Sequence, residues 1–135
     1  MRTKIIAKEL IVKLSYGEIR DTLFAFAFCV KQSISSSFKE TDYTEEIIKI
    51  VSQVEELSAF ATKCTEKIMA AYSQGVSKAE KAMKQPRKVD IGIISPILKQ
   101  LSDLLPQENY EALLNNLKSS GIDKVLQIKF KGNDE

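Results

Sequence analysis

The lysines near the middle of the chain are the densest group of side chains that could bind a ligand. With one arginine they form a basic stripe, whose members are Lys78, Lys81, Lys84, Arg87 and Lys88. Steps of three residues place the first three lysines on roughly one face of a helix. A positive stripe of this kind binds phosphate oxygens without reading sequence and with a strong dependence on salt.

The same stripe also has a purely structural interpretation. Lysines near the C-terminal end of a helix complement the helix dipole. No aromatic side chain is interleaved to stack on bases, and arginine, the preferred reader of bases and phosphates, is nearly absent from the stripe. We therefore favour a solvated helix end. Binding of a polyanion, nucleic acid above all, and binding of an acidic protein surface are the alternatives.

Histidine is absent from all 135 residues. Its absence removes the commonest general base, the usual partner of a catalytic serine or cysteine, and the commonest metal ligand. The chain also has no GxSxG turn and no glycine-rich loop that could cradle a phosphate. We expect a protein without enzymatic activity and without a cofactor.

Two cysteines and two pairs of glutamates complete the candidate ligands. Cys29 and Cys64 lie within apolar helical patterns, where free cysteine usually behaves as a small buried hydrophobe. A bridge between them or a redox role is the alternative. The adjacent glutamates at 45–46 and 55–56 are ten residues apart, about 15 Å along a helix. They cannot share one ion, so we expect no metal site.

A long amphipathic helix over residues 44–85 is the main element that positions these side chains. Apolar residues recur at the a and d places of a seven-residue repeat, and Pro86 ends the helix. Either Asp42 with Glu45, or Thr44 alone, can cap its start. The apolar pattern thins around residues 73–75, where a kink or break is the alternative to a continuous helix, and continuity through Gly75 stays open. Roughly 40 residues span about 60 Å, which no single shorter segment can cover.

A second copy of the chain is therefore the expected cover for the surplus apolar stripe. Small side chains on the stripe, among them Ala61, would allow another helix to approach closely. The predicted oligomer seam consists of Ile47, Ile50, Val54, Leu57, Ala61, Cys64, Ile68 and Tyr72.

Shorter elements surround this helix. Ser15 and Glu18 form a capping box that begins a helix over residues 16–36, and Ser95 with Pro96 begins another that ends at residue 105. A further helix closes at Gly121. Residues 87–92 are expected to be a loop. The apolar alternation over 125–131 predicts a strand, and residues 1–14 are a strand or, as the alternative, a helix.

These elements combine into an α+β fold that is predominantly α-helical. It has a long amphipathic central helix, shorter packed helices, and short terminal strands that pair into a small sheet. An all-α helical bundle is the alternative. The length of the chain predicts a single domain over residues 1–135.

Net charge and the distribution of apolar residues indicate where in the cell the protein is expected to be. The net charge is +2, so no overall field draws the chain to nucleic acid or membrane. The longest apolar run, residues 23–30, is far shorter than a bilayer requires, and charged residues interrupt residues 1–14. We expect a cytoplasmic protein that has no signal peptide and does not bind membranes.

The leading functional hypothesis is a non-enzymatic helical assembly or adaptor protein. It self-associates, as a dimer most simply, and binds a partner macromolecule. The first alternative is a nucleic-acid-associated accessory subunit that uses the basic stripe. The second is a small-ligand-binding protein with a pocket lined by Phe24, Phe26, Phe28 and Phe60.

Overall fold

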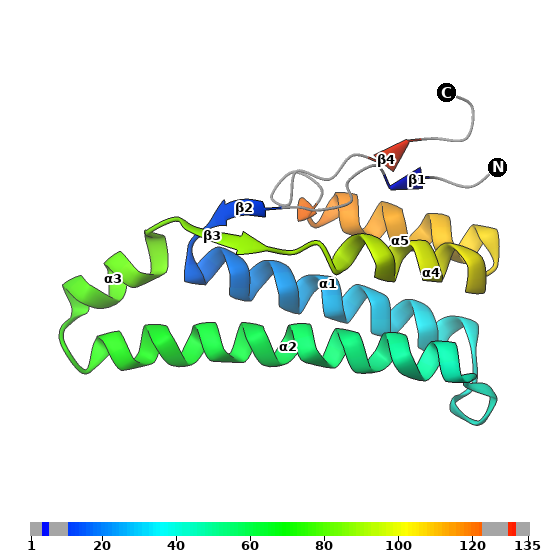
Figure 1. Cartoon of the computed structure of the whole chain (residues 1–135), viewed down its shortest axis with the longest axis horizontal. Helices are drawn as coiled ribbons and strands as arrows, with labels where there is room; N and C mark the ends of the chain where they lie inside the picture. The colour runs from blue at the N-terminus through cyan, green and yellow to red at the C-terminus, as the bar shows by residue number, and fades with distance from the viewer. Residues whose placement is uncertain (1–3, 6–10, 123–129, 132–135) are drawn as a thin grey trace.

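Two antiparallel helices, α1 (Tyr16–Ser37) and α2 (Glu45–Tyr72), form the body of the molecule (Figure 1). The short 3-10 helix η1 (Glu40–Asp42) lies in the connection between them. In this computed structural model, the described residues are 4–5, 11–122 and 130–131. The two helices lie side by side, so each covers part of the apolar stripe of the other.

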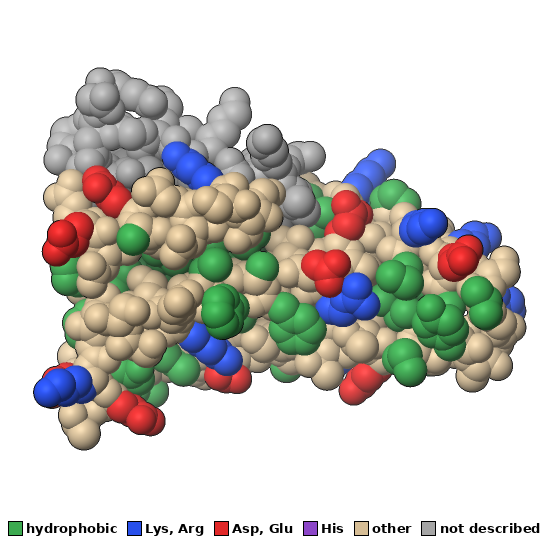
Figure 2. All heavy atoms as spheres, turned by 180° about the vertical axis from the view of Figure 1, so that it is seen from behind, with side chains coloured by type: hydrophobic (Ala, Val, Ile, Leu, Met, Phe, Trp, Pro, Cys, Tyr) green, Lys and Arg blue, Asp and Glu red, His purple; other side chains and the backbone are tan. Residues whose placement is uncertain are grey.

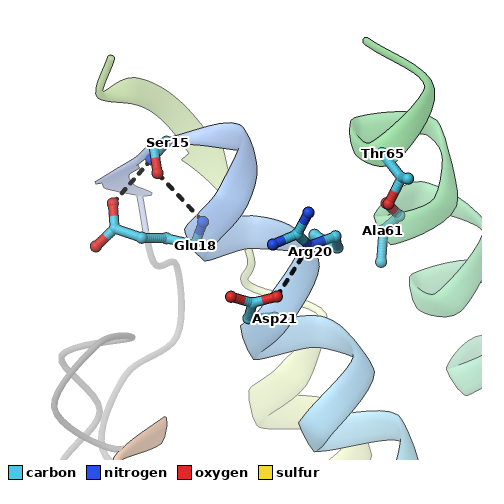
Figure 3. A network of polar contacts seen from close by, with 6 residues as sticks. All are labelled: Ser15, Glu18, Arg20, Asp21, Ala61 and Thr65. Atoms are coloured by element: carbon cyan, nitrogen blue, oxygen red, sulfur yellow. Dashed lines mark hydrogen bonds and ion pairs between the residues drawn. The ribbon is translucent and has the colours of Figure 1, made fainter. Parts of the chain in front are cut away.

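Side-chain caps begin both helices. The Ser15 hydroxyl accepts a hydrogen bond from the Glu18 N–H at 3.2 Å, and the Glu18 carboxylate accepts one from the Ser15 N–H at 3.0 Å (Figure 3). The Thr44 hydroxyl accepts a bond from the Ile47 N–H at 3.3 Å. These bonds satisfy donors that the first helical turn leaves unpaired. Both predicted caps are therefore confirmed.

The predicted helix over residues 44–85 is divided into two helices. α2 ends at Tyr72, and α3 (Val76–Lys84) begins after Gly75, which has a φ of +128°. Residues with a side chain rarely adopt this conformation, so glycine permits the chain to turn here. α3 then packs against the start of α1, where a Cβ atom on Gly17 would lie 3.3 Å from the Met83 carbonyl oxygen.

Two short antiparallel strand pairs complete the α+β fold. β2 (Ile11–Leu14) pairs with β3 (Arg87–Asp90), and β1 (Lys4–Ile5) pairs with β4 (Phe130–Lys131). The predicted pairing of the terminal strands is confirmed for these residues, while the rest of the strand predicted over 125–131 lies outside the described residues.

The loop expected over residues 87–92 is wrong at its first four positions. They form β3 because Val89 lies opposite Val12, and both side chains are buried. The helix expected to begin at Pro96, with Ser95 as its cap, begins two residues earlier as α4 (Ile94–Leu104), so the predicted Ser95 cap is wrong. α5 (Gln107–Ser119) follows it, and Gly121 has the expected positive φ, at +76°.

Apart from Ile68 and Ala79, the buried apolar side chains of the described residues form one cluster that extends from β2 to Ile122. Phe26 and Val30 of α1 lie in it with Ile50 and Val54 of α2, and none of the four is measurably exposed. The fold is α+β and predominantly helical, as predicted, and the two strand pairs exclude the all-α alternative.

Candidate interaction surfaces

The predicted oligomer seam lies inside a single copy of the chain. Seven of its eight residues are buried, and their positions on α2 are Ile47, Ile50, Val54, Leu57, Ala61, Cys64 and Ile68. Tyr72, the eighth, is 47 % exposed. α2 has 28 residues and α1 has 22, so one neighbouring helix covers most of the stripe. The expectation of a second copy rested on a helix of roughly 40 residues, and α2 is shorter than that.

The four phenylalanines of the predicted ligand pocket do not face one cavity. Phe26 is fully buried, whereas Phe24 and Phe28 are 41 % and 65 % exposed. Two residues along a helix turn a side chain by about 200°, so Phe26 points to the core and its two neighbours point to solvent. Phe60, on α2, is also exposed. These side chains do not build the predicted pocket.

A row of exposed side chains follows the outer face of α1. Asp21, Phe24, Phe28 and Lys31 are spaced by three, four and three residues, so they lie on one side of the helix. We call this row the α1 outer face. All four residues are exposed, and the two phenylalanines lie between charges of opposite sign.

An ion pair lies at each end of the α1 outer face. The Arg20 Nε atom is 2.9 Å from the Asp21 carboxylate (Figure 3), and the Lys31 Nζ atom is 2.8 Å from the Glu55 carboxylate on α2. Exposed pairs of this type contribute little to stability. They do restrict where the charged ends of Asp21 and Lys31 lie beside the phenylalanines.

A shallow groove of about 580 Å³ continues from this row toward η1. Phe28 and Lys31 of α1 line it together with Val51 and Glu55 of α2 and with Tyr43. Figure 2 shows the molecule from behind, with hydrophobic side chains spread along its length and charged side chains of both signs between them. The α1 outer face and this groove form a continuous surface, since Phe28 and Lys31 belong to both.

The basic stripe is extended by a lysine from the other end of the sequence. Lys13 on β2 lies directly opposite Lys88 on β3, and both are exposed. Residues directly opposite each other in an antiparallel pair point to the same face, so the two lysine side chains leave the sheet as neighbours. Sequence reasoning missed Lys13 because it did not predict β3 as a strand.

Arg87 makes a different contact from the lysines of the stripe. Its guanidinium carbon lies 4.2 Å from the centroid of the Tyr16 ring, a cation–π arrangement. We therefore define the basic surface by its lysines alone, which are Lys13, Lys78, Lys81, Lys84 and Lys88. All are exposed, and none forms an ion pair within the part of the chain that the structure describes.

Both cysteines are free and buried, as predicted for small hydrophobes within helices. Burial raises the pKa of the Cys29 and Cys64 thiols, because the charged thiolate loses its hydration in the core. A hydrogen bond with the Ser120 side chain opposes part of this rise at Cys29. The thiols are therefore protonated at neutral pH and are poor nucleophiles.

Acidic side chains do not converge in the described ranges. No three cysteine, aspartate or glutamate side chains among them are placed to hold a metal ion. Glu45, Glu46, Glu55 and Glu56 are all exposed on α2.

None of the helices, as far as the chain is described, is long and apolar enough to cross a membrane. The chain matches no protein-family model, and comparisons with curated proteins and with solved structures give no match either, so no relative suggests a function for it.

Proposed function

We propose that this chain is a non-enzymatic assembly protein that associates with a second copy of itself through the exposed apolar side chains of α1. One observation carries the proposal: Phe24 and Phe28 are both exposed and lie side by side, one helical turn apart on α1. Single exposed apolar residues are ordinary, but neighbouring exposed aromatic side chains mark surfaces that bind other proteins.

The proposal moves the interface from α2 to α1. The α2 stripe is already in contact with the chain's own core, so using it for association would require the fold to open. The α1 outer face needs no rearrangement, because its side chains already point to solvent. Burying a whole phenylalanine side chain contributes about 1.5–3 kcal/mol, and a large part of each ring is still exposed here.

Light scattering and sedimentation equilibrium over a range of concentrations test the proposal. We expect a concentration-dependent dimer that Phe28→Ser weakens roughly 100-fold, since a two-fold interface loses the ring twice. Ile11→Ser is the control, because Ile11 is 64 % exposed on β2 and belongs neither to the α1 outer face nor to the residues that line the groove. A natural chain that stays monomeric up to millimolar concentration, or equal weakening by both variants, would overturn the proposal.

Binding of a polyanion, nucleic acid foremost, is a second candidate function, and the Lys13–Lys88 pair favours it. Like charges directly opposite in a sheet destabilise the pairing. A phosphate chain lying over the two lysines would relieve their repulsion and could continue toward the lysines of α3. The adaptor role would then combine a self-associating face with a separate charged one.

Titration of a fluorescent random-sequence oligonucleotide at several salt concentrations tests this second function. We expect binding that falls steeply with salt and is lost in the Lys13→Glu/Lys88→Glu double variant. Lys99→Glu/Lys118→Glu, with the same change in charge on α4 and α5, is the control. Equal loss in both double variants would assign the binding to net charge alone, and absence of binding at low salt would remove the candidate.

A further inference from the structure

We infer that two copies of the chain pack α1 against α1 in antiparallel orientation, around a two-fold axis that passes between Phe24 and Phe28. This inference rests on the proposed function and specifies the contacts within the interface. It follows from the order of side chains along the α1 outer face.

When a second copy of the helix runs in the opposite direction, its row of side chains is complementary in charge to the row of the first copy. In one direction the row is acidic, aromatic, aromatic and basic: Asp21, Phe24, Phe28, Lys31. Residue 26 is the midpoint of both the phenylalanine pair and the charged pair. A two-fold axis there places Phe24 against Phe28 of the second copy, and Asp21 against Lys31 of the second copy. An isologous interface requires such reciprocal contacts.

The dimensions suit two crossing helices. Ten residues separate Asp21 from Lys31, which is about 15 Å along the helix axis. Both charged ends can therefore reach the second helix while the aromatic rings pack at the crossing point. A parallel arrangement would instead bring each charge against its own copy, acid against acid and base against base. The charges thus select the antiparallel orientation.

The existing ion pairs strengthen this selection. Arg20 lies beside Asp21, and Glu55 lies beside Lys31. At each end of the antiparallel dimer, Asp21 of one copy would lie between its own Arg20 and Lys31 of the other copy. That Lys31 would in turn lie between this Asp21 and its own Glu55, so the four charges alternate in sign. The rings contribute most of the affinity, whereas the charges determine orientation and the choice of partner. The basic surface cannot act as a self-complementary interface in this way, because its lysines would meet lysines.

Two single charge reversals test the inference. Asp21→Lys gives a copy with positive charge at both ends of the α1 outer face, and Lys31→Asp gives a copy with negative charge at both ends. Each variant alone should self-associate at least about 10-fold more weakly than the natural chain. An equimolar mixture should recover a heterodimer, since opposite charges then meet at both ends. Light scattering and sedimentation measure all three samples.

Matched reversals on α4 provide the control. Lys99→Asp and Asp103→Lys make the same changes in net charge at exposed positions away from α1, and we expect self-association to be unchanged in each and in their mixture. If the natural chain forms a dimer that neither α1 reversal weakens, or that the mixture fails to recover, the inference is overturned and the proposed function stands. If the natural chain is monomeric, both are overturned.

Discussion

The apolar stripe of α2 and the outer face of α1 are similar in their periodicity and opposite in their surroundings. The residues of both follow steps of three and four along a helix, although the α1 outer face has charged residues at its two ends. The first is covered by the chain's own α1 and by its core, and the second is covered by nothing that the structure describes. Helical periodicity therefore shows that a stripe can be buried, but it does not show whether the cover comes from the same chain. An interface is better sought among the apolar side chains that remain exposed after folding.

Val54→Asp should have the largest effect on stability. Val54 is fully buried in the α2 stripe, and a carboxylate there would be desolvated without a partner. We expect destabilisation of about 4–5 kcal/mol or more, enough to unfold most domains of this size. Circular dichroism during urea unfolding measures it. A variant that stays folded but loses its dimer would instead restore the α2 stripe as the interface.

Phe26→Ala and Phe28→Ala compare a buried with an exposed apolar side chain within a single helix. The two residues are of the same type and two positions apart, but only Phe26 is buried. We expect Phe26→Ala to reduce the free energy of unfolding by about 3–5 kcal/mol, whereas Phe28→Ala should change that of the monomer by less than about 0.5 kcal/mol. Urea unfolding at dilute concentration separates stability from association. Similar losses in both variants would mean that Phe28 is also part of the core.

Ionisation of the buried thiols should have the smallest effect on the free energy of unfolding, and this effect should be visible only at alkaline pH. Their pKa is raised in the folded chain, so the unfolded chain releases these protons first as pH rises. Stability from this source is complete below the usual thiol pKa and is lost as pH rises through the folded value. We expect Cys64→Ala to show a shallower decline in unfolding free energy above pH 9 than the natural chain. If the unfolding free energies of the two proteins decline in parallel above pH 9, Cys64 does not contribute to the pH dependence of stability.

Local signals in the sequence were sufficient for the starts of α1 and α2. The hydroxyls of Ser15 and Thr44 cap α1 and α2 by accepting a hydrogen bond from the N–H three residues later in the chain. Such a cap can be predicted from a few consecutive residues of the sequence. Gly75 likewise marks the break by its own conformational freedom. The candidate surfaces needed more than local signals. Lys13 reaches Lys88 only through a strand pairing between distant segments, and no short window of sequence contains both residues.

The α1 outer face was overlooked for a related reason. Phe24 and Phe28 sit in a helix that is apolar around much of its circumference, and sequence alone did not separate the sides. The structure separates them because α2 and α5 cover the side of Phe26 and leave the other to solvent. Which face stays exposed depends on how all the helices pack, and this is not encoded in any single helix.

The pairing of β2 with β3 has a consequence for the order in which the chain folds. Leu14 and Arg87 are 73 residues apart in sequence (87 − 14), whereas α1 and α2 are joined by a short connection. Contacts between close segments form quickly, and contacts across long loops form slowly. The helical hairpin should therefore exist before the Lys13–Lys88 pair does. A newly made chain would therefore expose its aromatic face before its basic surface is complete, so binding of a polyanion would require the chain to have passed this later step.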